Sequence, residues 1–165
     1  MKLSPIQLLE SSFEIVSIKR DFESSAADDI SLTDHLDLQV FRQLRHELNY
    51  WSEDDQVDPP ELKNRTYAVS LGIRTPPEKN YKHYNFEMVV TGVFVCLQEK
   101  FETKTVQDMV FEYGLTLLYG MIREQFAATT SRMRGGTKVL PIVSFLGEKA
   151  DIQKDADAQS ANQLK

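Results

Sequence analysis

Four side chains of this sequence could hold a metal ion or act as a nucleophile: His35, His46, His83 and Cys96. A structural metal site places such ligands at short, regular spacings, and the three histidines have no such spacing with each other or with Cys96. A reactive thiol needs an exposed and electropositive setting, whereas Cys96 lies in an apolar run. The sequence therefore predicts a buried thiol and no bound metal.

The glycine pair in Arg134-Gly135-Gly136-Thr137-Lys138 has some residues of a phosphate-binding loop. A phosphate cradle uses backbone amides at the start of a helix, whereas this pair follows a helical pattern. We interpret it as the end of that helix. No nucleophile-elbow pattern accompanies the serines and histidines, so we expect no cofactor and no enzyme activity.

Five aromatic residues remain as candidates for binding: Tyr50, Trp51, Phe111, Tyr113 and Tyr119. Tyr50 and Trp51 stand beside an acidic turn, and the other three lie in the expected helix. Each belongs either to a core or subunit interface, or to a hydrophobic groove that binds extended, non-native polypeptide. Aromatic rings suit such a groove because they offer a large apolar area at low entropic cost.

Composition narrows the function classes further. The chain has 165 residues, the length of one domain, with 41% hydrophobic and 27% charged residues. No apolar run is long enough to cross a membrane, and the first residues lack the pattern of a signal peptide. A single cysteine excludes a disulfide framework and favours the cytoplasm. The net charge of −6 argues against nucleic acid as the main partner.

The charge is divided unevenly along the chain. Residues 1–62 carry a net charge of −9, and residues 63–165 carry +3. Two solvated surfaces of opposite sign would explain this, and so would an acidic docking face for a basic partner.

The first half of the chain is predicted to form a short helix and then a sheet. Ser4 can cap a helix that begins at Pro5 and runs to Leu9. For the second strand, a helix over 39–48 is an open alternative, because Arg42 and His46 interrupt its apolar face. The four expected strands cover residues 13–18, 36–50, 67–73 and 84–97.

The second half is predicted to be one long helix over residues 105–133. Its residues are apolar on nearly every side, and the strand over 84–97 becomes apolar on both faces. A helix on the surface of a monomer shows a single apolar face, so we expect a second layer from another subunit. An extended segment over 139–146 follows, and residues 148–165 are expected to be a disordered polar tail after a domain of 1–147.

Three stretches of the chain resemble the SecB family of protein-export chaperones. The first is Pro5-Ile6-Gln7-Leu8-Leu9 leading to Phe13, Ile15 and Ile18. The second is Leu118-Tyr119-Gly120-Met121-Ile122-Arg123-Glu124, and the third is Leu140-Pro141-Ile142-Val143-Ser144-Phe145. The resemblance spans residues 4–147, and its specific part runs from the helix into the Leu-Pro segment. The chain departs from the family after Phe145, where a polar tail replaces a second helix.

The resemblance implies an α+β fold in which a four-stranded antiparallel sheet packs on one long helix. It implies a tetramer, a dimer of dimers, with helices sandwiched between sheets. Family members bind unfolded precursor proteins without ATP for export and pass them to the SecA motor through an acidic sheet surface. In this chain, Asp21 and Glu23 are the loosely placed candidates for that contact.

Two other functions stay open at this point. The N-terminal pattern Leu3-Ser4-Pro5-Ile6-Gln7 is similar to divergent SecB-like proteins, some of which chaperone the antitoxin of a toxin–antitoxin system. An oligomeric adaptor that binds one folded partner is the alternative from a different class. A chaperone binds many unfolded chains weakly, whereas an adaptor binds one partner tightly.

Overall fold

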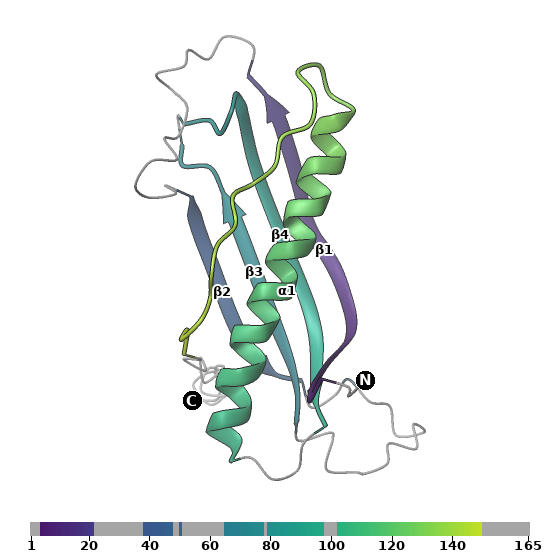
Figure 1. The fold of residues 1–165 in the computed structure, drawn as a ribbon, viewed down its shortest axis with the longest axis vertical. Helices are drawn as coiled ribbons and strands as arrows, with labels where there is room; N and C mark the ends of the chain where they lie inside the picture. Colours follow the sequence, from purple (N-terminus) through teal and green to yellow (C-terminus); the bar gives the residue numbers. More distant parts are fainter. Residues whose placement is uncertain are drawn as a thin grey trace, which may run out of the picture.

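The fold is a single antiparallel sheet with one helix lying across it (Figure 1). This computed structural model describes residues 4–21, 38–47, 50, 65–77, 79–97 and 102–149, and the structural statements below concern those residues. The elements are β1 (Ile6–Arg20), β2 (Gln39–His46), β3 (Thr66–Arg74), β4 (Tyr84–Cys96) and α1 (Thr103–Ser131). The strands lie in the order β1-β4-β3-β2. The predicted α+β architecture is confirmed, while the tetramer remains a prediction.

Two local predictions were wrong. The helix expected over residues 4–9 is instead the beginning of β1, which pairs with β4 from Ile6 opposite Cys96 to Arg20 opposite Tyr84. The hydroxyl of Ser4 does accept a hydrogen bond from the amide of Ile6, at 3.3 Å, as a cap would. Pairing with the long β4 outweighs this local signal. The helix alternative for 39–48 also fails, because β2 occupies Gln39–His46.

The alternating pattern of the central strands places one set of side chains beneath α1. Tyr67, Val69 and Leu71 of β3 are almost fully buried, and the even-numbered residues of β4 from Tyr84 to Cys96 are all buried. At the end of α1, the ring of Phe126 meets three aromatic rings. Its centroid lies 4.9 Å from that of Phe86, 6.1 Å from Tyr84 and 6.2 Å from Tyr81.

Buried residues recur at every fourth position along α1. They are Val106, Val110, Gly114, Leu118, Ile122, Phe126 and Thr130. Because four residues turn a helix slightly more than once, this row winds around α1 and follows the twisted sheet beneath it. Gly114 stands at the closest approach, where an added Cβ would lie 2.9 Å from Cγ2 of Val69 and 3.2 Å from Cε2 of Phe94.

We expect opposite stability changes from the same substitution at two glycines of α1. Gly114→Ala forces Val69 or Phe94 to move, so it should lower the free energy of unfolding by about 1 kcal/mol, net of the gain in helix propensity. Gly120 has no atom within 4 Å of the added Cβ, so Gly120→Ala should raise that free energy by about 0.5–1 kcal/mol. Urea unfolding of both variants measures this difference. Equal stabilisation by both substitutions would show that α1 does not press on β3 at Gly114.

Helix α1 ends at Ser131, two residues before the predicted end, and the glycine pair follows after a short turn. Gly135 and Gly136 have φ values of 123° and 74°, which side-chain-bearing residues rarely adopt. The chain then reverses and runs back beside α1 as an extended stretch (Figure 1), called here the C-terminal segment, residues 137–149. Within the described part of the chain, no helix is sufficiently long and apolar for a membrane crossing.

Candidate polypeptide-binding site

The first half of the C-terminal segment is held by three side chains that donate to consecutive backbone carbonyls. The hydroxyl of Tyr81 donates to the carbonyl of Val139 at 3.0 Å, and Nε of Arg123 donates to that of Leu140 at 3.0 Å. The hydroxyl of Tyr119 donates to the carbonyl of Pro141 at 2.9 Å. Leu140 is buried in the core. Residues from a hairpin and from α1 thus fix the position of this segment.

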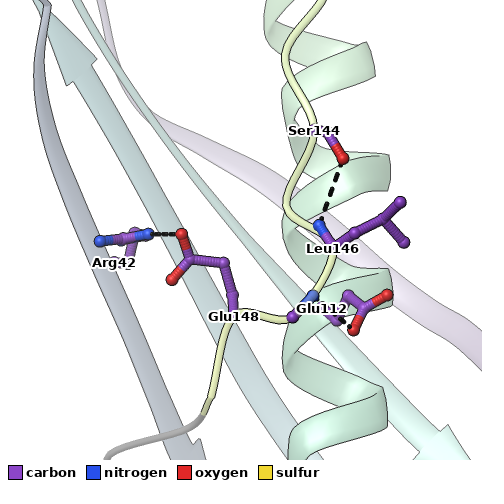
Figure 2. A network of polar contacts seen from close by, with 6 residues as sticks. Arg42, Glu112, Ser144, Leu146 and Glu148 are labelled. Atoms are coloured by element: carbon purple, nitrogen blue, oxygen red, sulfur yellow. Dashed lines mark hydrogen bonds and ion pairs between the residues drawn. The ribbon is translucent and has the colours of Figure 1, made fainter.

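The second half of the segment is attached by one buried ring and by two polar contacts, which Figure 2 shows. The ring of Phe145 packs against that of Tyr119, with 5.8 Å between centroids. The amide of Gly147 donates to Oε2 of Glu112 at 3.2 Å, and Glu148 forms an ion pair with Arg42 of β2 at 2.5 Å. Both partners of this ion pair are substantially exposed, so the contact adds little stability and can open readily.

An apolar hollow of about 200 Å³ lies between β2, α1 and the C-terminal segment. We call it the helix-side hollow. Its walls are Leu38, Val40, Arg42, Ile73, Tyr119, Val143 and Phe145. Its volume suits a large apolar side chain, and Arg42 is the one charged residue in its wall.

The helix-side hollow reaches solvent at Val40, which is 50% exposed. Ile142 and Leu146 of the C-terminal segment are 84% and 81% exposed but do not line the hollow. An apolar hollow with a half-exposed apolar wall is typical of a binding surface. The arrangement offers no chemistry beyond burial of apolar groups and backbone hydrogen bonding.

The attachment of the C-terminal segment through Tyr119 depends on pH. Burial raises the pKa of its hydroxyl to about 12, from the ordinary value of 10.0, with the nearby Arg123 guanidinium opposing the shift. Burial also raises the pKa of Tyr67 in the core. The hydroxyl of Tyr119 must be protonated to donate to Pro141, so its deprotonation removes one attachment of the C-terminal segment.

We expect the segment to loosen at alkaline pH. The pKa of Tyr119 is higher in the folded protein than in the unfolded chain, so its stabilising contribution is complete below pH 10 and disappears as the pH rises toward 12. Amide exchange or proteolysis of residues 137–149 should increase across that interval. In Tyr119→Phe, the segment should be looser at neutral pH and should lose this pH-dependent step, whereas an unchanged step would assign it to another group.

The structure separates the five aromatic candidates. Tyr119 lines the helix-side hollow, whereas Phe111 is buried in the core beneath α1. Tyr113 is 43% exposed. Tyr50 is half-buried, and Trp51 lies outside the described residues. Their predicted role in binding polypeptide stays a prediction.

Of the two candidate docking acids, only Asp21 lies within the described residues, and it does not line the helix-side hollow. Asp21 is exposed at the end of β1 and accepts a hydrogen bond from Nδ2 of Asn80 at 3.0 Å. Glu23 lies outside the described residues.

Sequence reasoning did not assign Val40, Val143 and Phe145 to the site. For Val143 and Phe145, the signal that could have found them is the apolar run that ends at Leu146; from Ile142 to Leu146 its residues alternate between exposed and more buried positions. An extended segment with that alternation packs one set of side chains inward and presents the other set to solvent. What could not be inferred is that β2 would lie opposite.

Comparisons with known proteins gave no match in sequence but several in structure, two of which are described below. No protein-family model matches the chain, and no curated protein matches it either. The fold is similar to that of a SecB-like chaperone. That protein, from Mycobacterium tuberculosis, was solved in complex with a peptide from an antitoxin. The TM-score is 0.46 at 14% identity, covering 84% of this chain and 91% of that one.

A second similar structure is a protein of unknown function from Streptococcus agalactiae. Its TM-score is 0.42 at 8% identity, with coverage of 83% of this chain and 97% of the other. The case for function below rests on the site itself.

Proposed function

We propose that this protein is an ATP-independent chaperone that holds unfolded polypeptide in an aggregation-resistant state. The observation that supports this is the apolar helix-side hollow, whose wall includes the half-exposed Val40. An apolar side chain of a client gains about 25 cal/mol for each Å² of apolar surface removed from water. Because that gain does not depend on sequence, the site suits many clients at modest affinity.

We also propose that four chains assemble, with clients bound outside the shared interface. The outward side of α1 exposes Tyr113 (43%) and Leu117 (38%), one helical turn apart. On the helix side of β1, Leu8 and Val16 are 38% and 44% exposed, because α1 lies mainly over β3 and β4. These residues form an apolar surface that a second copy would cover, consistent with the closed symmetry of most oligomers.

In the proposed role, the protein binds precursor proteins in the cytoplasm before their export. It then delivers them to the SecA motor through an acidic surface that includes Asp21 and Glu23. Service to one antitoxin is the variant of this role, since the similar Mycobacterium protein holds an antitoxin peptide. Either role uses the same site. In the export role many unfolded chains bind this site, whereas in the antitoxin role one dedicated segment binds it.

The test is a set of binding titrations with several unrelated, permanently unfolded proteins and with their folded forms. We expect micromolar binding of every unfolded form, no binding of the folded forms, and no effect of ATP. Emission from Trp51, the only tryptophan, should shift to the blue on binding if Tyr50 and Trp51 contact clients. Tight binding of a single folded partner, with no affinity for unfolded chains, would establish the adaptor alternative instead.

A further inference from the structure

Strand β2 forms one edge of the sheet, and half of the backbone N–H and C=O groups of β2 face away from the neighbouring strand β3. In an antiparallel pair, residues that bond to the neighbouring strand alternate with residues that do not. The amide of Glu47 donates to the carbonyl of Thr66 at 3.0 Å. Counting back from Glu47, the odd-numbered residues of β2 bond to β3. The N–H and C=O groups of Val40, Arg42 and Leu44 therefore point outward, and no described strand pairs with them.

The two edges of the sheet differ in regularity. The pairing of β1 with β4 shifts register twice, between Leu8 and Glu10 and between Phe13 and Ile15. Such irregularities are a common way to prevent a further strand from adding to an edge. The pairing of β2 with β3 runs through eight consecutive pairs without a shift, and β2 contains no proline or glycine. Among the residues that the structure describes, no strand pairs with the β2 edge, and its regular geometry suits an added strand.

Adjacent residues of β2 lie at two apolar hollows on opposite faces of the sheet. Val40 lines the helix-side hollow. Phe41, which is 53% exposed, lies in a row across the other face with Gly72, Val89 and Ile15. These four residues line a second hollow of about 460 Å³, called here the outer hollow.

Gly72 keeps the outer hollow open. A Cβ on this residue would lie 3.3 Å from Cγ2 of Val89 and 3.4 Å from Cβ of Phe41, so even a methyl group would occupy the floor between them. Successive side chains of an extended strand point to opposite faces. A strand added to β2 would therefore direct one side chain toward the helix-side hollow and the next toward the outer hollow.

We propose that a client binds as a fifth strand, in extended form, along the outer edge of β2. This inference rests on the proposed function and specifies how its site is used. The segment carries consecutive large apolar residues for the two hollows. It also carries acidic residues, which would take the places of Glu148 at Arg42 and of Glu47 at Arg45 on a strand that has no acid of its own. The outer hollow, where Arg74 lies with Glu14 and Glu87, receives an apolar residue.

A second copy of this chain fits the same edge poorly. Antiparallel pairing of two β2 strands would bring four arginines together with no acidic residue on either strand. Like charges on paired strands are destabilising. Backbone pairing also explains recognition without a fixed sequence, because every polypeptide offers the same N–H and C=O groups.

The first experiment measures hydrogen exchange at single amides of the full-length protein. The probe is a labelled peptide with the core Leu-Phe-Leu flanked by glutamate and serine. On binding, amide exchange at Val40 and Arg42 should slow at least tenfold, while exchange at Phe41 and Gln43, which already bond to β3, should stay unchanged. Bound peptide with no alternating protection would overturn strand addition and leave the proposed function standing.

The second experiment removes hydrogen bonds from each partner in turn. Two versions of the peptide carry N-methyl groups on alternate residues, so only one version loses the amides that face β2. That version should bind at least tenfold more weakly than the other. In the protein, Val40→Pro removes an outward N–H without removing a bond to β3, and edge strands tolerate this change. It should weaken binding about tenfold more than its control, Val40→Ala.

The outcomes separate the two proposals. Equal binding of both methylated peptides, or equal effects of Val40→Pro and Val40→Ala, would contradict strand addition alone. If neither this peptide nor unrelated unfolded proteins bind the wild-type chain, the proposed function falls, and strand addition falls with it. Phe41→Ala should weaken binding severalfold, whereas Val16→Ala, at a residue of β1 that is 44% exposed, should leave peptide affinity unchanged.

Discussion

Replacing Leu117 by glutamate is expected to split the assembled protein into smaller species. Leu117 and Tyr113 stand on successive turns of α1 and expose apolar surface that the chain itself does not cover. If a second subunit covers them, a carboxylate at position 117 would be buried without a partner, at a cost of several kcal/mol. Light scattering at micromolar concentration should show a mass of roughly four chains for the wild type and one or two for the variant.

A matched control separates loss of assembly from a general effect of added charge. Ile142→Glu places the same carboxylate on the C-terminal segment, at a residue that is 84% exposed. It should retain the mass of the wild type. Circular dichroism should show that both variants keep their strands and helix. A wild-type protein that is already monomeric would contradict the proposed interface.

The second large effect is expected from Val143→Asp in the wall of the helix-side hollow. A carboxylate there would have to give up its water whenever a client side chain entered the hollow. Affinity for the unfolded proteins should fall at least tenfold, as measured by fluorescence anisotropy of labelled clients. Val143 is only partly buried, so the fold should survive the change.

The neighbouring residue provides the control for this experiment. Ile142→Asp makes the same chemical change on the same segment, but Ile142 does not line the hollow. We expect its client affinity to stay within about threefold of the wild type, which is about 0.6 kcal/mol. Equal losses in both variants would mean that binding depends on exposed apolar surface in general and not on the hollow.

The elements with strong patterns were predicted closely. The alternation of large and small residues in β3 and the long apolar run of β4 located both strands to within about one residue of Thr66–Arg74 and Tyr84–Cys96. The helix was predicted over residues 105–133 and is observed over Thr103–Ser131, so both of its ends were predicted two residues late. These elements are determined mainly by their own periodicity.

The errors and omissions involve contacts between distant parts of the chain. Ser4-Pro5 is a good local start for a helix, yet thirteen register pairs with β4 draw this stretch into β1. Tyr119 was recognised as a binding candidate, but its partner Phe145 depends on the reversal of the chain after Gly136. The role of Gly72 in the outer hollow could not be predicted from the sequence. It depends on which residues of β2 and β4 lie beside Gly72 in the sheet.

The most direct test of the account is suppression of aggregation by the purified protein without nucleotide. A chemically denatured test protein is diluted into buffer that contains the wild type, Val143→Asp or Ile142→Asp, and light scattering is followed over time. The account predicts that the wild type and Ile142→Asp suppress aggregation equally with and without ATP, and that Val143→Asp does so only at much higher concentration. Aggregation that proceeds unchanged with the wild type, or that stops only when ATP is hydrolysed, would contradict it.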